Sequence, residues 1–147
     1  MRSVFVFLNK VEQVKIIEKL NAICENKNNL QWIYMKNDDP ILYIEFDKNK
    51  SLLKDFEENT RKRIETILCG KLEHILIIDI SGRHSGEKEV LLVLKKLLES
   101  FHGYGMDDYT EELWTLEEII SGHKKKIISF LTTLGGMKKI IKVNTVI

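Results

Sequence analysis

The chain has 147 residues, of which 44% are hydrophobic, and its 23 basic and 22 acidic residues give a formal net charge of +1. This composition is typical of a folded globular protein and excludes disordered, fibrous and disulfide-scaffold classes. The near balance of charges argues against a protein that coats nucleic acid. We therefore expect one domain over residues 1–147 that binds no nucleic acid.

The two cysteines, Cys24 and Cys69, each lie on the apolar side of an expected helix. Neither has a second cysteine or a paired histidine at metal-ligand spacing, so we expect buried free thiols in a reducing compartment. The apolar run near the start is too short for a secretory signal, and no apolar stretch approaches the length of a membrane span. These features predict a cytoplasmic protein that is not associated with membranes.

The first half of the chain alternates short apolar runs with helical patterns. Residues 4–8 predict a buried strand, and apolar residues recur at helical spacing within 11–25. Residues 30–36 and 41–46 are rich in aromatic and β-branched types, and the Asn-Asp-Asp-Pro between them predicts the loop of a hairpin. A helical stripe over 53–68 and a continuous apolar strand over 74–80, expected to be central, complete this half.

The order of these elements is β-α-β-β-α-β, which predicts an α+β fold with an antiparallel sheet and a ferredoxin-like core. In that arrangement two helices cover one face of the sheet. An apolar helix over residues 87–101, capped by Ser85, is expected to cover the other face. The capping-box pattern from Thr115 to Glu118 predicts a short helix over 116–121. A further helix from residue 124 and a late strand over 140–146 give a largely helical C-terminal extension.

A glycine-containing loop between the strand at 74–80 and the helix at 87–101 offers one candidate site. Gly82, Arg83, His84 and Gly86 lie where backbone amides and cationic side chains can bind an anion. The spacing is not that of a Walker A motif, because three residues separate the glycines and Glu87 follows the second. The competing interpretation is a turn that begins the next helix. A small anionic-ligand-binding regulator is therefore one functional alternative.

The densest charge in the sequence lies between residues 107 and 118. Six acids and no base occur there, with a tryptophan among them: Asp107, Asp108, Glu111, Glu112, Trp114, Glu117 and Glu118. Carboxylates are the ligands that magnesium prefers, so Asp107, Asp108 and Glu111 are candidates for a metal-dependent hydrolase or nuclease. In a structural interpretation the acids lie at helix N-termini, and Trp114 is mostly buried and anchors the segment in the core. A third interpretation is an acidic surface that receives a basic protein partner.

Four motifs occur in order between residues 39 and 122. They are Asp-Pro-Ile-Leu-Tyr-Ile-Glu-Phe-Asp, Ile-Ser-Gly-Arg followed by Gly-Glu-Lys-Glu-Val, Phe-His-Gly, and Asp-Asp-Tyr-Thr-x-x-Leu-Trp-Thr-Leu-Glu-Glu-Ile. With these motifs the chain resembles small bacterial immunity proteins of polymorphic toxin systems. The resemblance implies a cytoplasmic, non-enzymatic protein without a cofactor that binds one cognate protein toxin and blocks it. No catalytic residues come with it, and the acidic segment with Trp114 is the expected partner-binding region.

Overall fold

The structure is a computed structural model that describes residues 2–28, 30–48, 51–108 and 112–121, with the backbone alone at 124–125 and 128–129. Within these ranges the chain forms a six-stranded antiparallel sheet, five helices and a separate two-stranded sheet. The α+β class and the antiparallel sheet that the sequence predicts are therefore confirmed. No helix in this part of the chain is long and apolar enough to cross a membrane.

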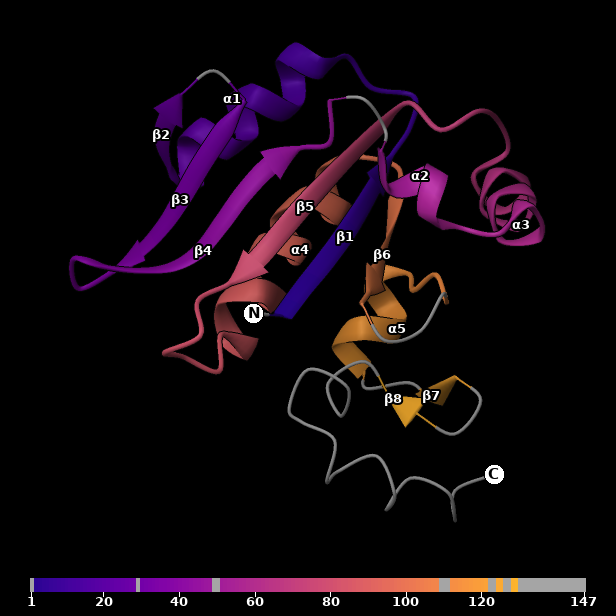
Figure 1. Ribbon diagram of the computed structural model, residues 1–147. Helices are drawn as coiled ribbons and strands as arrows, with labels where there is room; N and C mark the ends of the chain where they lie inside the picture. The colour runs from indigo at the N-terminus through magenta and orange to yellow at the C-terminus, as the bar shows by residue number, and fades with distance from the viewer. Residues whose placement is uncertain are drawn as a thin grey trace.

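The main sheet has the strand order β2-β3-β4-β5-β1-β6 (Figure 1). Its strands are β1 (Arg2–Leu8), β2 (Glu25–Asn28), β3 (Gln31–Lys36), β4 (Asp39–Phe46), β5 (His74–Ile80) and β6 (Gly103–Asp107). The helices are α1 (Gln13–Ile23), α2 (Ser51–Asp55), α3 (Glu58–Leu68), α4 (Glu87–Ser100) and α5 (Leu116–Ser121), and the small sheet pairs β7 (Lys124–Lys125) with β8 (Ile128–Ser129). Strands β2 to β5 thus follow one another across the sheet, and β1 lies between β5 and β6.

This strand order is not the predicted ferredoxin-like order, in which the first strand lies beside the second strand of the hairpin. Here β5 separates them, because it pairs with β4 on one edge and with β1 on the other. The expectation that β5 is central is confirmed. Ile75 and Leu76 are consecutive residues of β5, and they belong to apolar clusters on opposite faces of the sheet. This part of the strand is therefore buried from both sides.

The helices do not cover the sheet faces as expected. Helices α1, α4 and α5 share one face, where Ile16, Leu20, Leu94 and Ile119 belong to the larger apolar cluster. Helix α3 lies on the opposite face, where Ile64 and its neighbours pack with Phe7 and Ile75. The predicted pairing of the first two helices on one face is therefore wrong. The apolar stripes of α1 and α4 bury against the same face of β1, β4 and β5, and α4 packs beside α1.

The predicted hairpin is confirmed as β3 and β4, with a shorter loop. Asn37 and Asp38 form a two-residue turn, and both have positive φ, at 52° and 64°. Such turns match the twist of the adjoining strands. Pro40, expected in the loop, instead pairs with Met35 within β4 at a shift in register. Such an irregularity near the start of a strand tolerates the missing proline N–H.

Other boundaries also differ from the predictions. Strands β2 and β6 were not predicted, and the stripe over 53–68 is divided at Phe56 into α2 and α3. The helices predicted over 87–101 and 116–121 are confirmed as α4 and α5. The helix predicted from residue 124 is contradicted by β7 and β8. The rest of that helix and the strand at 140–146 lie outside the described residues.

Candidate functional site

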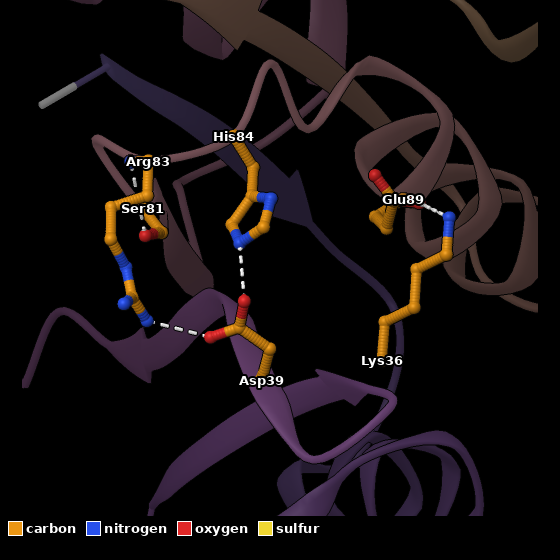
Figure 2. A network of polar contacts seen from close by, with 6 residues as sticks. All are labelled: Lys36, Asp39, Ser81, Arg83, His84 and Glu89. Atoms are coloured by element: carbon orange, nitrogen blue, oxygen red, sulfur yellow. Dashed lines mark hydrogen bonds and ion pairs between the residues drawn. The ribbon is translucent and has the colours of Figure 1, made fainter.

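A cluster of charged side chains joins the β3–β4 hairpin to the loop between β5 and α4 (Figure 2). Asp39 begins β4 and points towards Arg83 and His84 of that loop. Arg83 Nη2 donates to Asp39 Oδ1 at 2.6 Å, and His84 Nε2 lies 2.8 Å from Asp39 Oδ2. Lys36 Nζ, at the end of β3, lies 3.5 Å from Glu89 Oε2 of α4. The hairpin is therefore tied both to the loop and to the first turn of α4.

These contacts border a cleft of about 500 Å³ that includes Lys36, Asp39 and His84 in its lining. An imidazole held by a carboxylate is arranged like a general base. Hydrolysis by nucleophilic catalysis needs in addition a hydroxyl or thiol within hydrogen-bonding reach of that base. Among the described residues, the His84 imidazole hydrogen-bonds to Asp39 and to no serine hydroxyl or cysteine thiol. The cleft therefore presents an imidazole that Asp39 orients.

Two of the loop residues predicted to bind an anion, Arg83 and His84, point towards the carboxylate of Asp39. Arg83 and His84 both contact the carboxylate of Asp39, one at each oxygen. Gly82 is exposed beside them and forms part of the turn. The structure thus brings two of the predicted residues together, and their common contact is an internal one.

Gly86 has a structural role at the start of α4. It is the N-cap of that helix with φ of 68°, and a Cβ at this position would lie 2.5 Å from Ile80 Cγ2. The predicted cap, Ser85, is exposed and is not the N-cap. Glu87 and Glu89 occupy the first turn of α4. Their carboxylates complement the positive end of the helix dipole, so a further anion would meet electrostatic repulsion there.

The two adjacent aspartates of the acidic segment have different surroundings. Asp107 ends β6 and is 1% exposed. Asp108 accepts a hydrogen bond from the Ser3 backbone N–H at 3.0 Å and lies 3.3 Å from Arg2 Nε, so it holds the start of β1. Within the described ranges, no group of three or more His, Cys, Asp or Glu is placed to hold a metal ion. Glu111, the third residue of the predicted metal site, lies outside those ranges.

Trp114 is 1% exposed, which confirms the prediction that it is mostly buried. Its backbone exchanges two hydrogen bonds with Gly105 of β6, at 2.8 and 2.9 Å. Its side chain belongs to the cluster under α1 and α4, whereas the preceding Leu113 belongs to the cluster under α3. The segment therefore packs into the apolar clusters on both faces of the sheet. The Trp114 side chain is too buried to contact a partner in this conformation.

The predicted capping box begins α5. Thr115 N–H donates to Glu118 Oε1 at 2.9 Å, and Glu118 N–H donates to Thr115 Oγ1 at 3.1 Å. Glu112 is half-buried, whereas Glu117 is exposed on the first turn of the helix. Among the described acids of this segment, Glu117 is therefore exposed, Asp107 is buried, and Asp108 and Glu118 form hydrogen bonds within the fold.

The two cysteines are free thiols in different environments. Burial raises the pKa of the Cys24 thiol from 9.0 to about 12, so it stays protonated and unreactive near neutral pH. Cys69, also predicted to be buried, is exposed. It ends α3 in the left-handed conformation with φ of 59°, which turns the chain out of the helix.

A second candidate surface is the part of the sheet that no helix covers. The cluster beneath α3 draws residues from β1, β5 and β6 but none from β3 or β4. Figure 1 views the sheet towards the uncovered area, with α4 behind β5. Alternation along β4 places Leu42, Ile44 and Phe46 in the core under α1 and α4. Tyr43 and Glu45 consequently face the uncovered side, and both are half-buried.

Neighbouring strands extend this uncovered face in register. Tyr43 is paired with Ile33 on β3 and with Asp79 on β5, while Glu45 is paired with Gln31 and with Ile77. A hollow of about 120 Å³ lies here, lined by Lys27, Gln31, Trp32, Ile33, Tyr43, Ile44, Glu45 and Asp79. We call this area the open sheet face. It combines apolar, aromatic and carboxylate groups, a mixture suited to binding another protein.

The open sheet face was missed because it combines residues of the β3–β4 hairpin with residues of β5, which is distant from the hairpin in the sequence. A signal was nevertheless present in the strand at 74–80, where Asp79 is a single carboxylate in an otherwise apolar run. Such a charge within a central strand predicts a face that is not fully covered.

Comparisons of the chain with protein-family models, with curated proteins and with solved structures give no match. Its function is therefore inferred from the residues and surfaces described above.

Proposed function

We propose that the chain is an immunity-type, cytoplasmic protein that binds and neutralises a cognate bacterial toxin without catalysis. The observation that carries this proposal is the open sheet face, where Ile33, Tyr43 and Ile77 are only half-buried on the side of the sheet that lacks a helix over β3 and β4. Apolar and aromatic surface bordered by charge is typical of protein-binding sites. The motifs shared with immunity proteins between residues 39 and 122 point in the same direction.

The acidic segment contributes a second, peripheral part of the proposed surface. Glu117 is exposed on the first turn of α5 and lies close in sequence to the predicted Glu111 and Glu112, and carboxylates at the rim of an interface accelerate association with a basic partner. Asp107 and Trp114 were predicted to bind the partner, but both are buried, so the proposed surface does not include them. Asp108 bonds to β1 and Glu118 to Thr115, so the proposed surface does not include them either.

The alternative functions have less support. A metal-dependent hydrolase would need Asp107 and Asp108 to reach a common ion, whereas one is buried and the other is bonded to β1. We expect no heat of binding when magnesium or manganese is titrated into the chain in a calorimeter. An anion-binding regulator would need Arg83 and His84, which contact Asp39. Thermal stabilisation by phosphate that disappears in Arg83→Ala would favour the regulator.

The direct test uses the toxin gene that an immunity gene accompanies. The proposal requires a large toxin gene next to the gene for this chain, and its absence would count against the proposal. The C-terminal domain of that toxin is then expressed from an inducible promoter, alone and together with the chain. We expect the toxin domain to stop growth and co-expression to restore it, with a stable complex on co-purification. Growth arrest that the wild-type chain does not relieve would refute the proposed function.

A further inference from the structure

We infer that the hollow on the open sheet face receives an arginine side chain of the protein partner. This inference rests on the proposed function, and it names the chemistry by which the partner is recognised. It depends on three half-buried residues, Tyr43 and Glu45 of β4 and Asp79 of β5, which line the same hollow of about 120 Å³.

The register of the sheet fixes how these three residues lie. Asp79 is directly opposite Tyr43, and Ile77 is directly opposite Glu45. Glu45 and Asp79 are therefore diagonal neighbours on adjacent strands, for which Cα–Cα separations of about 7–8 Å are typical. A guanidinium placed between two such carboxylates can donate to both, whereas a compact ammonium offers no planar fork.

The charges in and around the hollow favour a cation from outside. Among the described residues, neither Glu45 nor Asp79 has an ion-pair partner. Glu45 accepts a hydrogen bond from Gln31 Nε2 at 3.2 Å, and Asp79 accepts one from the Ser3 hydroxyl, so both carboxylates are oriented by neutral donors. Lys27 is a cation in the lining and forms no ion pair with either of them. Two oriented carboxylates without a counter-ion are complementary to one incoming positive group.

Tyr43 and its neighbours favour arginine over lysine. An aromatic ring beside paired carboxylates lets a guanidinium stack on the ring while it donates to the acids. Ile33 is directly opposite Tyr43 on β3, and Ile77 faces the same side of β5. Their apolar surface can contact the methylene stem of the same side chain. The lining thus offers contacts both to the methylene stem and to the guanidinium of an arginine.

A small probe tests the site without the toxin. N-acetyl-arginine amide is titrated into the full-length chain while backbone amide shifts are followed by NMR, and N-acetyl-citrulline amide serves as the uncharged probe of the same shape. We expect saturable shifts at Tyr43, Glu45 and Asp79 with the arginine probe only, and their loss in the Glu45→Gln, Asp79→Asn double variant. Equal responses to both probes, or shifts centred on another surface, would overturn the inference.

The toxin domain provides the second arm. The double variant should bind it at least about tenfold more weakly, because each charge-assisted hydrogen bond contributes strongly to affinity. Tyr43→Leu should also weaken binding, whereas Tyr43→Phe keeps the ring and should not. Glu18→Gln is the matched control, because it removes an exposed carboxylate from α1 on the covered side. Melting temperatures establish that each variant is folded.

The outcomes separate the two proposals. A wild-type chain that does not bind the toxin domain refutes the proposed function. A wild-type chain that binds, with a double variant that binds equally well, refutes only the arginine site. A dimer in solution that the double variant disrupts would assign the hollow to a second copy of the chain and would overturn the inference.

Discussion

Truncation of Trp114 to alanine tests how the acidic segment is held. The indole is 1% exposed and belongs to the larger apolar cluster, while the two backbone hydrogen bonds to Gly105 do not depend on the side chain. The cost is therefore that of an emptied core site, about 3–5 kcal/mol for a buried tryptophan. Since domains of this size are stable by about 5–15 kcal/mol, this is a large share of the free energy of unfolding.

Urea unfolding followed by far-UV circular dichroism measures this loss, because fluorescence would report only on the remaining Trp32 in the variant. The midpoint should fall with an unchanged slope. Trp114→Phe should lose less, and Glu117→Ala, which truncates an exposed acid nearby, should stay within about 0.5 kcal/mol of the wild type. A loss below about 1 kcal/mol for Trp114→Ala would refute the anchoring role.

Four further predictions depend on local contacts and on burial. Thr115→Ala removes the acceptor for Glu118 N–H and should lower the free energy of unfolding by about 1 kcal/mol in urea melts, whereas Thr115→Ser should not; equal stability of all three proteins would contradict it. Because burial raises the pKa of Cys24 to about 12, a thiol reagent near neutral pH should label only Cys69 in the folded chain, and rapid labelling of Cys69→Ser would contradict this. Because the pKa of Cys24 is raised in the folded chain, its contribution to the free energy of unfolding is fully present below pH 9.0 and should decline as the pH rises from 9.0 towards about 12. A comparison of the melting temperatures of Cys24→Ala and the wild type across this range measures the decline. The Arg83 side chain is 71% exposed, so Arg83→Ala should lower the free energy of unfolding by less than about 1 kcal/mol, and a much larger loss in thermal melts would contradict a surface ion pair.

Local signals predicted much of the fold correctly. The hairpin, the central strand β5, and helices α4 and α5 all depend on patterns within a short stretch of sequence, such as the capping box at Thr115. Strand order and helix placement could not be predicted in the same way. An apolar stripe on a helix requires a buried face, but it does not specify which side of the sheet provides that face.

The candidate site shows the same division. Charge density drew attention to the acidic segment, but sequence alone could not reveal that Asp107 is buried or that Asp108 bonds to β1. Arg83 and His84 were predicted as candidate anion-binding residues, but their contact with Asp39, which was expected in the hairpin loop, could not be predicted. The open sheet face depends on pairing between Tyr43 and Asp79, which only the three-dimensional register brings together.

The central claim is that a toxin binds over the open sheet face, and methyl cross-saturation NMR tests it most directly. The chain is labelled at isoleucine δ1 methyls and bound to the unlabelled toxin domain, which is irradiated. We predict transfer to Ile33 and Ile77 on the open sheet face, and none to Ile16, a residue of α1 that is buried against the opposite face of the sheet. Transfer centred on Ile120, which is 56% exposed on α5 beside the acidic segment, would contradict the account and place the interface there.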